Sequence, residues 1–395
     1  MEWNPLVDEQ LLEAWQNYCE RLRDLGTEIL RDTAPKTTVD RAEGFRYLAR
    51  LVAMGIEAGF AHDGEVPMLR RSLGTNAKMY GDNPDTLYEG CALDPNGTYR
   101  VHGTMGSPHL LVFNVSRDAS ALGKGKSLLV GQLYGHELDV DDDGTFELWL
   151  GGEARERNWI ALDDGAARLA IRQIMGDWTT DAPGRFIIER VDAVPPSSPY
   201  TPDRFIAELG VAARTPSLVP MWANESDTVR KRANTFYLDD HDHQKQYGGV
   251  PGGEAVLSWF ELEPHQALVI EVTPPPCAYW NLQIGNYWYE SFDYRRHLSS
   301  VNGRQAIAED DGVVRMVVAH EDPGVPNWLD TGGHREGHLA LRWVEAEHHP
   351  VPKAEVVDLD AWQRGLPPTA TRFDPATRAE QIAARRRAVD RRFVP

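Results

Sequence analysis

Asn327-Trp328-Leu329, followed by Gly337-His338-Leu339-Ala340-Leu341-Arg342, is a pattern that occurs twice in this sequence. An earlier stretch repeats it as Asn158-Trp159-Ile160, followed by Arg168-Leu169-Ala170-Ile171-Arg172. Both contain Asn-Trp-aliphatic, a glycine-containing turn and Leu-Ala-aliphatic-Arg, at an offset of 327 − 158 = 169 residues. Two shorter matches lie at offsets of 169 and 168: Leu93-Asp94-Pro95 with Leu262-Glu263-Pro264, and Asp143-Gly144 with Asp311-Gly312. Three matches in the same order predict an internal duplication.

The duplicated parts read as β-structure. Short runs that alternate in polarity are separated by turn residues such as Asp94-Pro95-Asn96-Gly97, which is typical of antiparallel sandwiches and barrels. We therefore predict an α+β, mainly β protein with two tandem antiparallel β-sandwich or jelly-roll-like modules. The expected organisation is a helical region at 1–82, module one at 83–192, a helical linker with a Gly/Pro loop at 193–253, module two at 254–360 and a helical tail at 361–395.

Helices are expected at both ends of the chain. Apolar residues recur every three or four positions over 7–31 and over 40–60, which predicts a helical hairpin that Thr38 or Asp40 could cap. The tail from 376 to 392 is a basic helix. It is either a solvated terminal helix or a self-association arm that meets the acidic body, and so allows a homo-oligomer.

The bulk composition limits the partners. The 395 residues are 42% hydrophobic and carry a formal charge of −19, which argues against nucleic acid and anionic membranes. A neutral or cationic ligand is favoured. The three cysteines are far apart and odd in number, so we expect reduced thiols that are mostly buried. The N-terminus lacks the features of a signal peptide and no apolar run is long enough to span a membrane, so we predict the cytoplasm.

A duplication separates scaffold residues from site residues. Residues shared by both copies are expected to serve the fold, as the two Asn-Trp pairs would by turn formation and core burial. Arg172 and Arg342, at equivalent strand positions, are expected to make structural ion pairs. Residues found in one copy are candidates for function.

Module two contains a polar, aromatic segment from 277 to 296 that module one lacks. On a strand, Trp280 and Leu282 face one way, and Asn281 and Gln283 the other. Amides with aromatic rings beyond them predict a ligand-binding concavity, and a solvated sheet face is the alternative. The substrate-binding candidates here are Trp280, Asn281, Gln283, Asn286, Tyr287, Trp288 and Tyr294, with Glu290 and Asp293 as acids.

A second difference follows the repeated Asn-Trp. The loop of module two carries Asp330, His334 and Arg335, which suit acid/base chemistry with an anion holder, although an ordinary polar turn is the alternative. At the start of module one, turn chemistry explains Asn83-Pro84 but leaves Asp85 and Tyr88 without an explanation. We take Asp85 as a catalytic candidate and Tyr88 as a substrate-binding candidate.

Cofactor motifs are missing from the sequence. His241-Asp242-His243 has the His-x-His pattern of some jelly-roll metal sites, but it lies in a loop without the expected downstream glutamate. A soluble acidic loop is the better interpretation. Phosphate-binding glycine loops, nucleotide fingerprints and nucleophile elbows do not occur. We therefore expect neither a metal nor a cofactor.

Three stretches together resemble a known family. They are Asn83-Pro84-Asp85-Thr86-Leu87-Tyr88, Tyr279-Trp280-Asn281, and Asn327-Trp328-Leu329 through Leu339-Ala340-Leu341-Arg342. In this order they resemble the bacterial domain of unknown function 1214, which is often paired with a 1254-type domain. The likeness extends from about residue 80 to 345. It implies a β-rich, two-module fold in which both modules can contribute to one site, and it implies no reaction.

The functional hypothesis follows from the aromatic and acidic candidates. We predict an enzyme of hydrolase or lyase type, without a redox cofactor, that acts on a neutral small organic molecule or glycan in an aromatic-lined cleft. The alternative is a non-catalytic ligand-binding or scaffold protein. Perturbed carboxylates in the cleft would favour the enzyme, and solvated ones the alternative.

Overall fold

Two β-rich modules follow one another along the chain. The computed structural model describes residues 5–61, 63–117, 128–193, 199–240 and 252–393. Module one contains β1 Arg70–Leu73, β2 Thr86–Ala92, β3 Tyr99–Thr104, β4 Leu110–Arg117, β5 Leu129–Tyr134, β6 Thr145–Leu150, β7 Trp159–Ile160, β8 Ala166–Ile174 and β9 Arg185–Arg190. Module two contains β10 Tyr237–Leu238, β11 Gly253–Glu261, β12 Gln266–Val272, β13 Tyr279–Gly285, β14 Ser300–Asn302, β15 Val314–Ala319, β16 Trp328–Asp330, β17 Glu336–Val344 and β18 Lys353–Asp358.

The strand order confirms the internal duplication. The five-stranded sheet of module one has the order β1-β2-β8-β4-β5, and that of module two has β10-β11-β17-β13-β14. The four-stranded sheets correspond in the same way, as β7-β6-β3-β9 and β16-β15-β12-β18. Each four-stranded sheet contains one parallel pair, β6 with β7 and β15 with β16, and its other pairs are antiparallel. Each strand therefore has a counterpart at the same place in the other module.

The repeated Asn-Trp pairs adopt the same conformation in both copies. Asn158 has a φ of 46° and Asn327 a φ of 55°, a region that asparagine tolerates better than most residues. The amide of each asparagine bonds both the N–H and the C=O of one residue on a distant loop, Asp139 or Ile307. The indole N–H of the following tryptophan donates to a backbone oxygen in both modules. The pairs fix the loop that leads into β7 or β16.

Each sandwich has its own apolar core between its two sheets. In module one, Val101, Phe113 and Leu148 belong to this core and are completely buried. In module two, Trp280, Leu282 and Ile284 point into the core, as the alternation along β13 predicts. The opposite face of each five-stranded sheet is therefore the one that faces the rest of the molecule.

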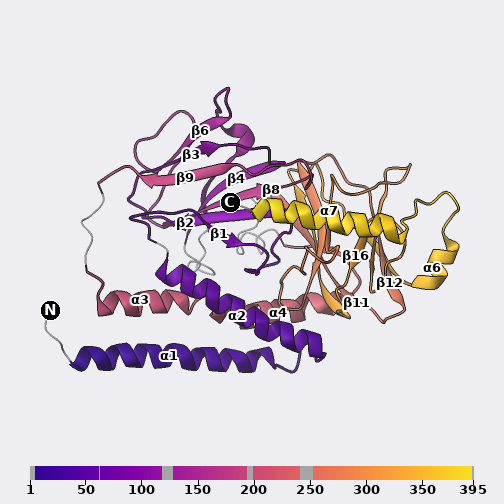
Figure 1. Ribbon diagram of the computed structural model, residues 1–395, viewed down its shortest axis with the longest axis horizontal. Coiled ribbons are helices and arrows are strands. Elements are labelled where there is room, and N and C mark those ends of the chain that lie inside the picture. The colour runs from indigo at the N-terminus through magenta and orange to yellow at the C-terminus, as the bar shows by residue number, and fades with distance from the viewer. Residues whose placement is uncertain (1–4, 62, 118–127, 194–198, 241–251, 394–395) are drawn as a thin grey trace.

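Helices cover that opposite face in module two. The N-terminal hairpin is formed by α1 Pro5–Ile29 and α2 Thr38–Phe60, and the linker contains α3 Pro202–Ala212 and α4 Val219–Val229. Figure 1 shows these four helices along one side of the two modules. Leu51 of α2 and Trp222 of α4 share a buried cluster with Trp259 of β11. The N-cap of α2 is Thr37, whose hydroxyl accepts the N–H of Asp40. The predicted caps, Thr38 and Asp40, are therefore wrong by one and three positions.

The C-terminal helix α7, Pro375–Phe393, crosses from one module to the other (Figure 1). One face carries Arg378, Arg385 and Arg392 at intervals of seven residues, and all three are buried. Arg378 pairs with Asp322 of module two, while Arg392 donates to the C=O of Pro84 in module one. This face of the basic helix is used within the chain, and a homo-oligomer through α7 stays a prediction.

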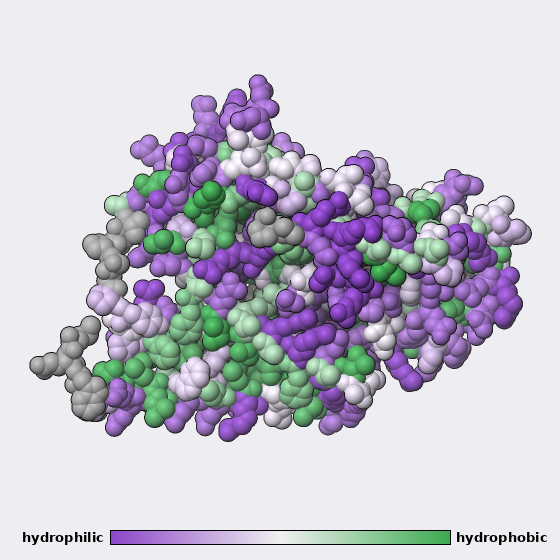
Figure 2. Space-filling model, in the orientation of Figure 1, coloured by the Kyte–Doolittle hydropathy of each residue, from purple (hydrophilic) through white to green (hydrophobic). Residues whose placement is uncertain are grey.

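Apolar side chains gather on the outer surface of the helical layer. Figure 2 shows this area over α1 and α2, where Leu12, Trp15 and Phe45 are each about half exposed. The rest of the visible surface is largely hydrophilic. Within the described ranges, no helix combines the length and apolar character that a membrane crossing requires.

Candidate functional site

A cavity of about 400 Å³ is lined by both modules. Strands β2 and β8 of module one and β11 and β17 of module two contribute to its wall, together with residues of α2 and α4. The two five-stranded sheets thus face a common space with their outer surfaces. A cavity of this size suits a small molecule.

Equivalent residues of the duplication line this space. β8 contributes Arg168, Ala170 and Arg172, and β17 contributes His338, Ala340 and Arg342 at an offset of 342 − 172 = 170. The intervening residues of each strand belong to the sandwich cores. The repeated Leu-Ala-aliphatic-Arg therefore does two jobs, because its leucine builds the core and its arginine reaches the cavity.

Arg342 has only neutral hydrogen-bond partners. Its guanidinium donates to the side chain of Gln283 at 2.8 Å and to the C=O of Gly81 at 2.6 Å. Arg172 donates to the side-chain oxygen of Asn114 at 2.5 Å. The expected ion pair is wrong for Arg342, since no carboxylate of the described residues lies within ion-pair distance of it.

Arg168 is the most unusual cation of the cavity wall. Among the described residues its Nε has no hydrogen-bond partner, and its guanidinium makes neither a hydrogen bond nor an ion pair. Burial lowers the pKa of Arg168, yet an arginine keeps its charge in a protein. Gly90 of β2 gives the side chain room, because a Cβ there would lie 3.4 Å from the Arg168 Nε.

Aromatic rings form the side of the cavity opposite the sheets. Trp222 of α4 packs against Tyr80 and Tyr289, with ring centroids 4.8 and 5.1 Å apart. Tyr80 and Tyr289 both have positive φ, 62° and 55°, and the C=O of Tyr289 accepts the N–H of Gly81. Such backbone strain persists only where the surroundings hold it, and it is frequent at ligand sites.

His338 extends this aromatic wall as a neutral ring. Its imidazole stacks on Tyr289 at 4.6 Å with an interplanar angle of 4°. Burial lowers the pKa of His338 to about 4, so the ring is uncharged near neutrality. The Nδ1 lies 3.0 Å from the C=O of Asn286, which makes it the donor and leaves the Nε2 as an acceptor. No described residue bonds this Nε2.

The segments Asn83–Tyr88 and Tyr279–Asn281 meet where the modules join. The carboxylate of Asp85 accepts the hydroxyl of Tyr279 at 2.5 Å and the indole N–H of Trp178 at 2.8 Å. The side chain of Asn83 binds Asn281 at 2.9 Å. Tyr88 lies on the cavity wall, where its hydroxyl accepts the N–H of Asn83 and keeps its proton for a second partner.

Comparisons with known proteins show what the chain is similar to. The model of DUF1214, a protein of unknown function, matches residues 260–348. The crystal structure of an uncharacterized protein from Burkholderia cenocepacia has 36% identity and a TM-score of 0.84, and the match covers 89% of this chain and 99% of that chain. The chain belongs to the DUF1214 family. A Vibrio parahaemolyticus structure matches 79% of this chain and 98% of its own with 12% identity and a TM-score of 0.42. No curated protein matches the chain.

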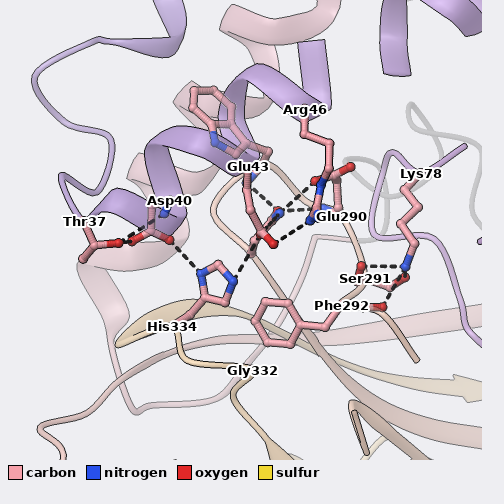
Figure 3. A network of polar contacts seen from close by, with 12 residues as sticks. Thr37, Asp40, Glu43, Arg46, Lys78, Glu290, Ser291, Phe292, Gly332 and His334 are labelled. Carbon is pink, nitrogen blue, oxygen red and sulfur yellow. Dashed lines mark hydrogen bonds and ion pairs between the residues drawn. The ribbon is translucent and has the colours of Figure 1, made fainter. Parts of the chain in front are cut away.

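A second polar cluster in this DUF1214 protein ties α2 to module two. His334 lies between Asp40 and Glu43, with Nδ1 2.7 Å from Asp40 and Nε2 3.1 Å from Glu43 (Figure 3). Burial alone would lower the pKa of His334, but the two carboxylates raise it to about 9. Burial would raise the pKa of Glu43, but bonds to His334 and Asn286 lower it to about 2. The imidazole is therefore a charged link between helix and loop.

The turn from Asn286 to Ser291 connects this cluster with the cavity. Glu290 is buried and pairs with Arg50 of α2 at 2.5 Å, and burial raises the pKa of Glu290 in spite of that cation. The amide of Asn286 reaches both Glu43 and Glu290. Lys78 donates to two carbonyl oxygens and the hydroxyl of the Ser291–Phe292 segment (Figure 3). All of these charges have partners, which marks a structural network.

The loop predicted for acid/base chemistry does not bring its own residues together. Asp330 pairs with His297 at 2.7 Å, whereas His334 turns to the carboxylates of α2. Arg335 is largely exposed, 3.9 Å from Glu263. Asp293 is also at the surface, beside Arg296. The geometry offers no joint role for Asp330, His334 and Arg335.

The aromatic candidates of module two are mostly core residues of this family member. Trp280 packs on Trp343 inside the sandwich, and Trp288 packs on Tyr47 under α2. Tyr287 binds Asp227 of α4, and Tyr294 lies over the Lys78 ammonium near α7. Asn281 and Gln283 act indirectly, since their side-chain oxygens accept the guanidinium of Arg342. Of the predicted site residues, only Tyr88 lines the cavity itself.

The arginines that line the cavity could have been identified from a pattern in the sequence. Arg172 and Arg342 belong to the repeated Leu-Ala-aliphatic-Arg element, whose sharing between the copies predicts a scaffold role, and Arg168 stands just before the first copy of that element. The pattern on β8 could have indicated the cavity wall, because Arg168 and Arg172 flank Ala170 on one face while the other face is apolar and buried. No group of three potential metal ligands occurs among the described residues, and the predicted loop with His241 and His243 lies outside them.

Proposed function

We propose that this protein binds a small organic anion in the cavity between its two β-modules. One observation carries the proposal, namely that Arg168 and Arg342 both line this cavity and that neither guanidinium pairs with a carboxylate of the described residues. A buried charge without a partner is costly. An anionic ligand would supply the missing partner.

The neighbouring cations support an anion over a neutral ligand. Arg342 binds only neutral oxygens, so its charge is not compensated by a carboxylate of the described chain. Guanidinium groups bind carboxylates in a two-pronged geometry that combines charge with direction. A neutral molecule or glycan, which the overall charge of −19 favours, would leave these positive charges unmatched.

The remaining wall sets the shape of the ligand. Flat rings are contributed by Trp222, Tyr80 and Tyr289. The small side chains of Ala170 and Ala340 leave space above the two sheets. Such surroundings favour an apolar or aromatic body attached to the anionic group. Phenylacetate is a simple molecule with both properties.

Titration calorimetry with matched acids and amides tests the proposal. Phenylacetate should bind and phenylacetamide should bind at least about tenfold more weakly, because a charged hydrogen bond contributes more than a neutral one. Arg342→Met should abolish phenylacetate binding. Arg386→Met, which removes an exposed arginine of α7, is the matched control. Equal binding of acid and amide, or unchanged binding by Arg342→Met, would refute the proposal.

An enzyme of hydrolase or lyase type in the same cavity is the second candidate. It is favoured by His338, a neutral imidazole on the cavity wall whose Nε2 is without a partner among the described residues. A neutral imidazole nitrogen can accept a proton from water or from a bound acid. Turnover found in a screen of carboxylic esters and hydroxy acids should be lost in His338→Gln, while phenylacetate still binds.

A further inference from the structure

The arginines that β8 and β17 contribute to the cavity fall into two groups along strand β8. Arg168 and Arg172 are four residues apart on the same face, which separates their Cα atoms by about 13 Å at the usual strand rise. The register places Tyr88 of β2 directly opposite Arg172, and Ala92 opposite Arg168. The two arginines therefore serve different ends of the cavity.

The first group consists of Arg172, Arg342 and Tyr88, and we call it the paired-arginine end. Burial raises the pKa of Tyr88, and the charges of Arg342 and Arg172 both oppose that rise, so both act on the same hydroxyl. Arg342 comes from module two and Arg172 from module one. The two copies of the repeat thus supply one arginine each to a single place.

The second group consists of Arg168 and Tyr80, and we call it the Arg168 end. Burial raises the pKa of Tyr80 to about 12, and the charge of Arg168 opposes the rise. The duplication offers no second cation here, because His338 occupies the position in β17 that Arg168 occupies in β8 and is neutral. Arg168 is the single cation of this end among the described residues of the two strands.

On β8, β2 and β17 the surface between the two ends is apolar, whereas Arg70 of β1, beside Gly90, also lines the cavity and lies 3.9 Å from Glu57. Ala170 separates Arg168 from Arg172 on β8, and Gly90 lies opposite Ala170 on β2. Ala340 occupies the equivalent place on β17. These small residues leave a shallow floor beneath the rings of Trp222 and Tyr289. Two cationic ends joined by an apolar floor fit a molecule with two anionic ends joined by an apolar segment.

We propose that the ligand of the cavity is a dicarboxylate whose two acid groups are held apart by an apolar linker, one at the paired-arginine end and one at the Arg168 end. This inference rests on the proposed binding of an organic anion. It adds a second acid group and a minimum length. Guanidinium groups that line one cavity repel each other, and a dianion offsets the charge at both ends.

Calorimetric titration with acids of matched length tests the inference. Suberate should bind the unmodified protein about tenfold or more tightly than octanoate, since the second carboxylate gains a charged hydrogen bond. Succinate is too short to reach both ends and should show no gain over butyrate. The mono- and dicarboxylates differ only at the far end, so the ratio of their affinities isolates Arg168.

Variants at Arg168 locate the second acid group. Arg168→Met should reduce the suberate-to-octanoate ratio to about one while octanoate affinity changes less than about threefold, because only the far end is altered. Arg168→Lys should restore part of the ratio, and Arg386→Met should leave it unchanged. Thermal unfolding of each variant shows that it is folded.

The outcomes separate this inference from the proposed function. If octanoate and suberate bind the unmodified protein equally well, the second acid site is wrong and the anion cavity stands. If Arg168→Met keeps the preference for suberate, the second acid does not bind at Arg168. If none of the acids binds, the proposed function itself fails.

Discussion

Strands β8 and β17 occupy the same place in their modules, yet they bring different charges to the cavity. β8 contributes Arg168 and Arg172, whereas β17 contributes Arg342 and a neutral His338. The arginine shared by both copies makes one end of the cavity common to the two modules. At the other end, Arg168 of module one corresponds to the neutral His338 of module two, so only module one contributes a cation there. The two copies therefore contribute unequal charge to the two ends of the cavity.

The surroundings of the two strands differ as well. The outer face of module two is covered by α2 and α4, and the loop before β17 is tied to α2 through His334. The corresponding loop before β8 contains Asp163, which pairs with Arg117 of its own module. Module two thus anchors the helical layer, and module one closes the cavity against it.

The largest effect is expected where the modules meet. Asp85→Ala removes the acceptor of Tyr279 and Trp178 and leaves Arg385 and Arg392 of α7 without the nearby negative charge, so we expect a loss of ~3–5 kcal/mol in the free energy of unfolding. Urea unfolding measures it. Asp85→Asn, which keeps an acceptor, should lose less. A loss below about 1 kcal/mol would show that the modules are joined by other contacts.

The link between module two and α2 should depend on pH. The pKa of His334 is raised from 6.5 to about 9, so its contribution is complete below pH 6.5 and is lost as pH rises through about 9. On the acid side, Glu43 contributes above pH 4.5 and loses its contribution as pH falls through about 2. The pKa shifts of His334 and Glu43 arise partly from the same ion pair, so its stabilisation is counted only once.

His334→Gln tests this dependence. At pH 6 the variant should be about 3 kcal/mol less stable than the unmodified protein, because a raised pKa of this size corresponds to that energy. The difference should shrink as the pH rises above 9. Urea unfolding at both pH values measures it. A difference that is equal at both values would mean that His334 contributes by packing on Phe292 and not by charge.

The repeated asparagines offer a matched pair of smaller effects. Asn327 is buried and makes three side-chain hydrogen bonds, whereas Asn158 makes two at a more exposed position. We expect Asn327→Ala to cost about 2–3 kcal/mol and Asn158→Ala about 1 kcal/mol, from lost hydrogen bonds and a strained positive φ. Asn327→Gly, which relieves the strain, should cost less than Asn327→Ala. Equal losses at both positions would remove this asymmetry between the modules.

The smallest effect is expected to be a gain. Arg168→Met replaces a half-buried cation, which has no hydrogen bond or ion pair with the described residues, by an apolar side chain of similar length, so the ligand-free protein should gain about 1 kcal/mol. Thermal unfolding in a buffer without organic acids measures the shift. A loss of stability would show that Arg168 serves the fold and not a ligand.

Much of the architecture could be predicted because it depends on local patterns. The stripe of apolar residues gives α1 and α2, and the repeated Asn-Trp and Leu-Ala elements give two copies of one sandwich. The alternation along β13 correctly separates Trp280 and Leu282 from Asn281 and Gln283. These features depend on the period of a strand or helix, which a sequence displays directly.

The site could not be predicted in the same way, because it depends on which surfaces meet. His334 pairs with Asp40, which lies 294 residues earlier in the chain, and no sequence spacing predicts that pair. Sharing between copies was expected to mark scaffold, which is correct for Asn158 and Asn327. Arg172 and Arg342 also make contacts within the fold, but the duplication places these equivalent residues on the wall of one shared cavity.

The helix α7 has a consequence for the way this protein is made. Its arginines reach Pro84 near the start of module one, 308 residues earlier, and Asp322 within module two. A ribosome must therefore synthesise both sandwiches before the segment that holds them together leaves its exit tunnel. Each sandwich has its own core and can fold as it emerges. The contacts of α7 with both modules therefore form only after the two sandwiches have been synthesised.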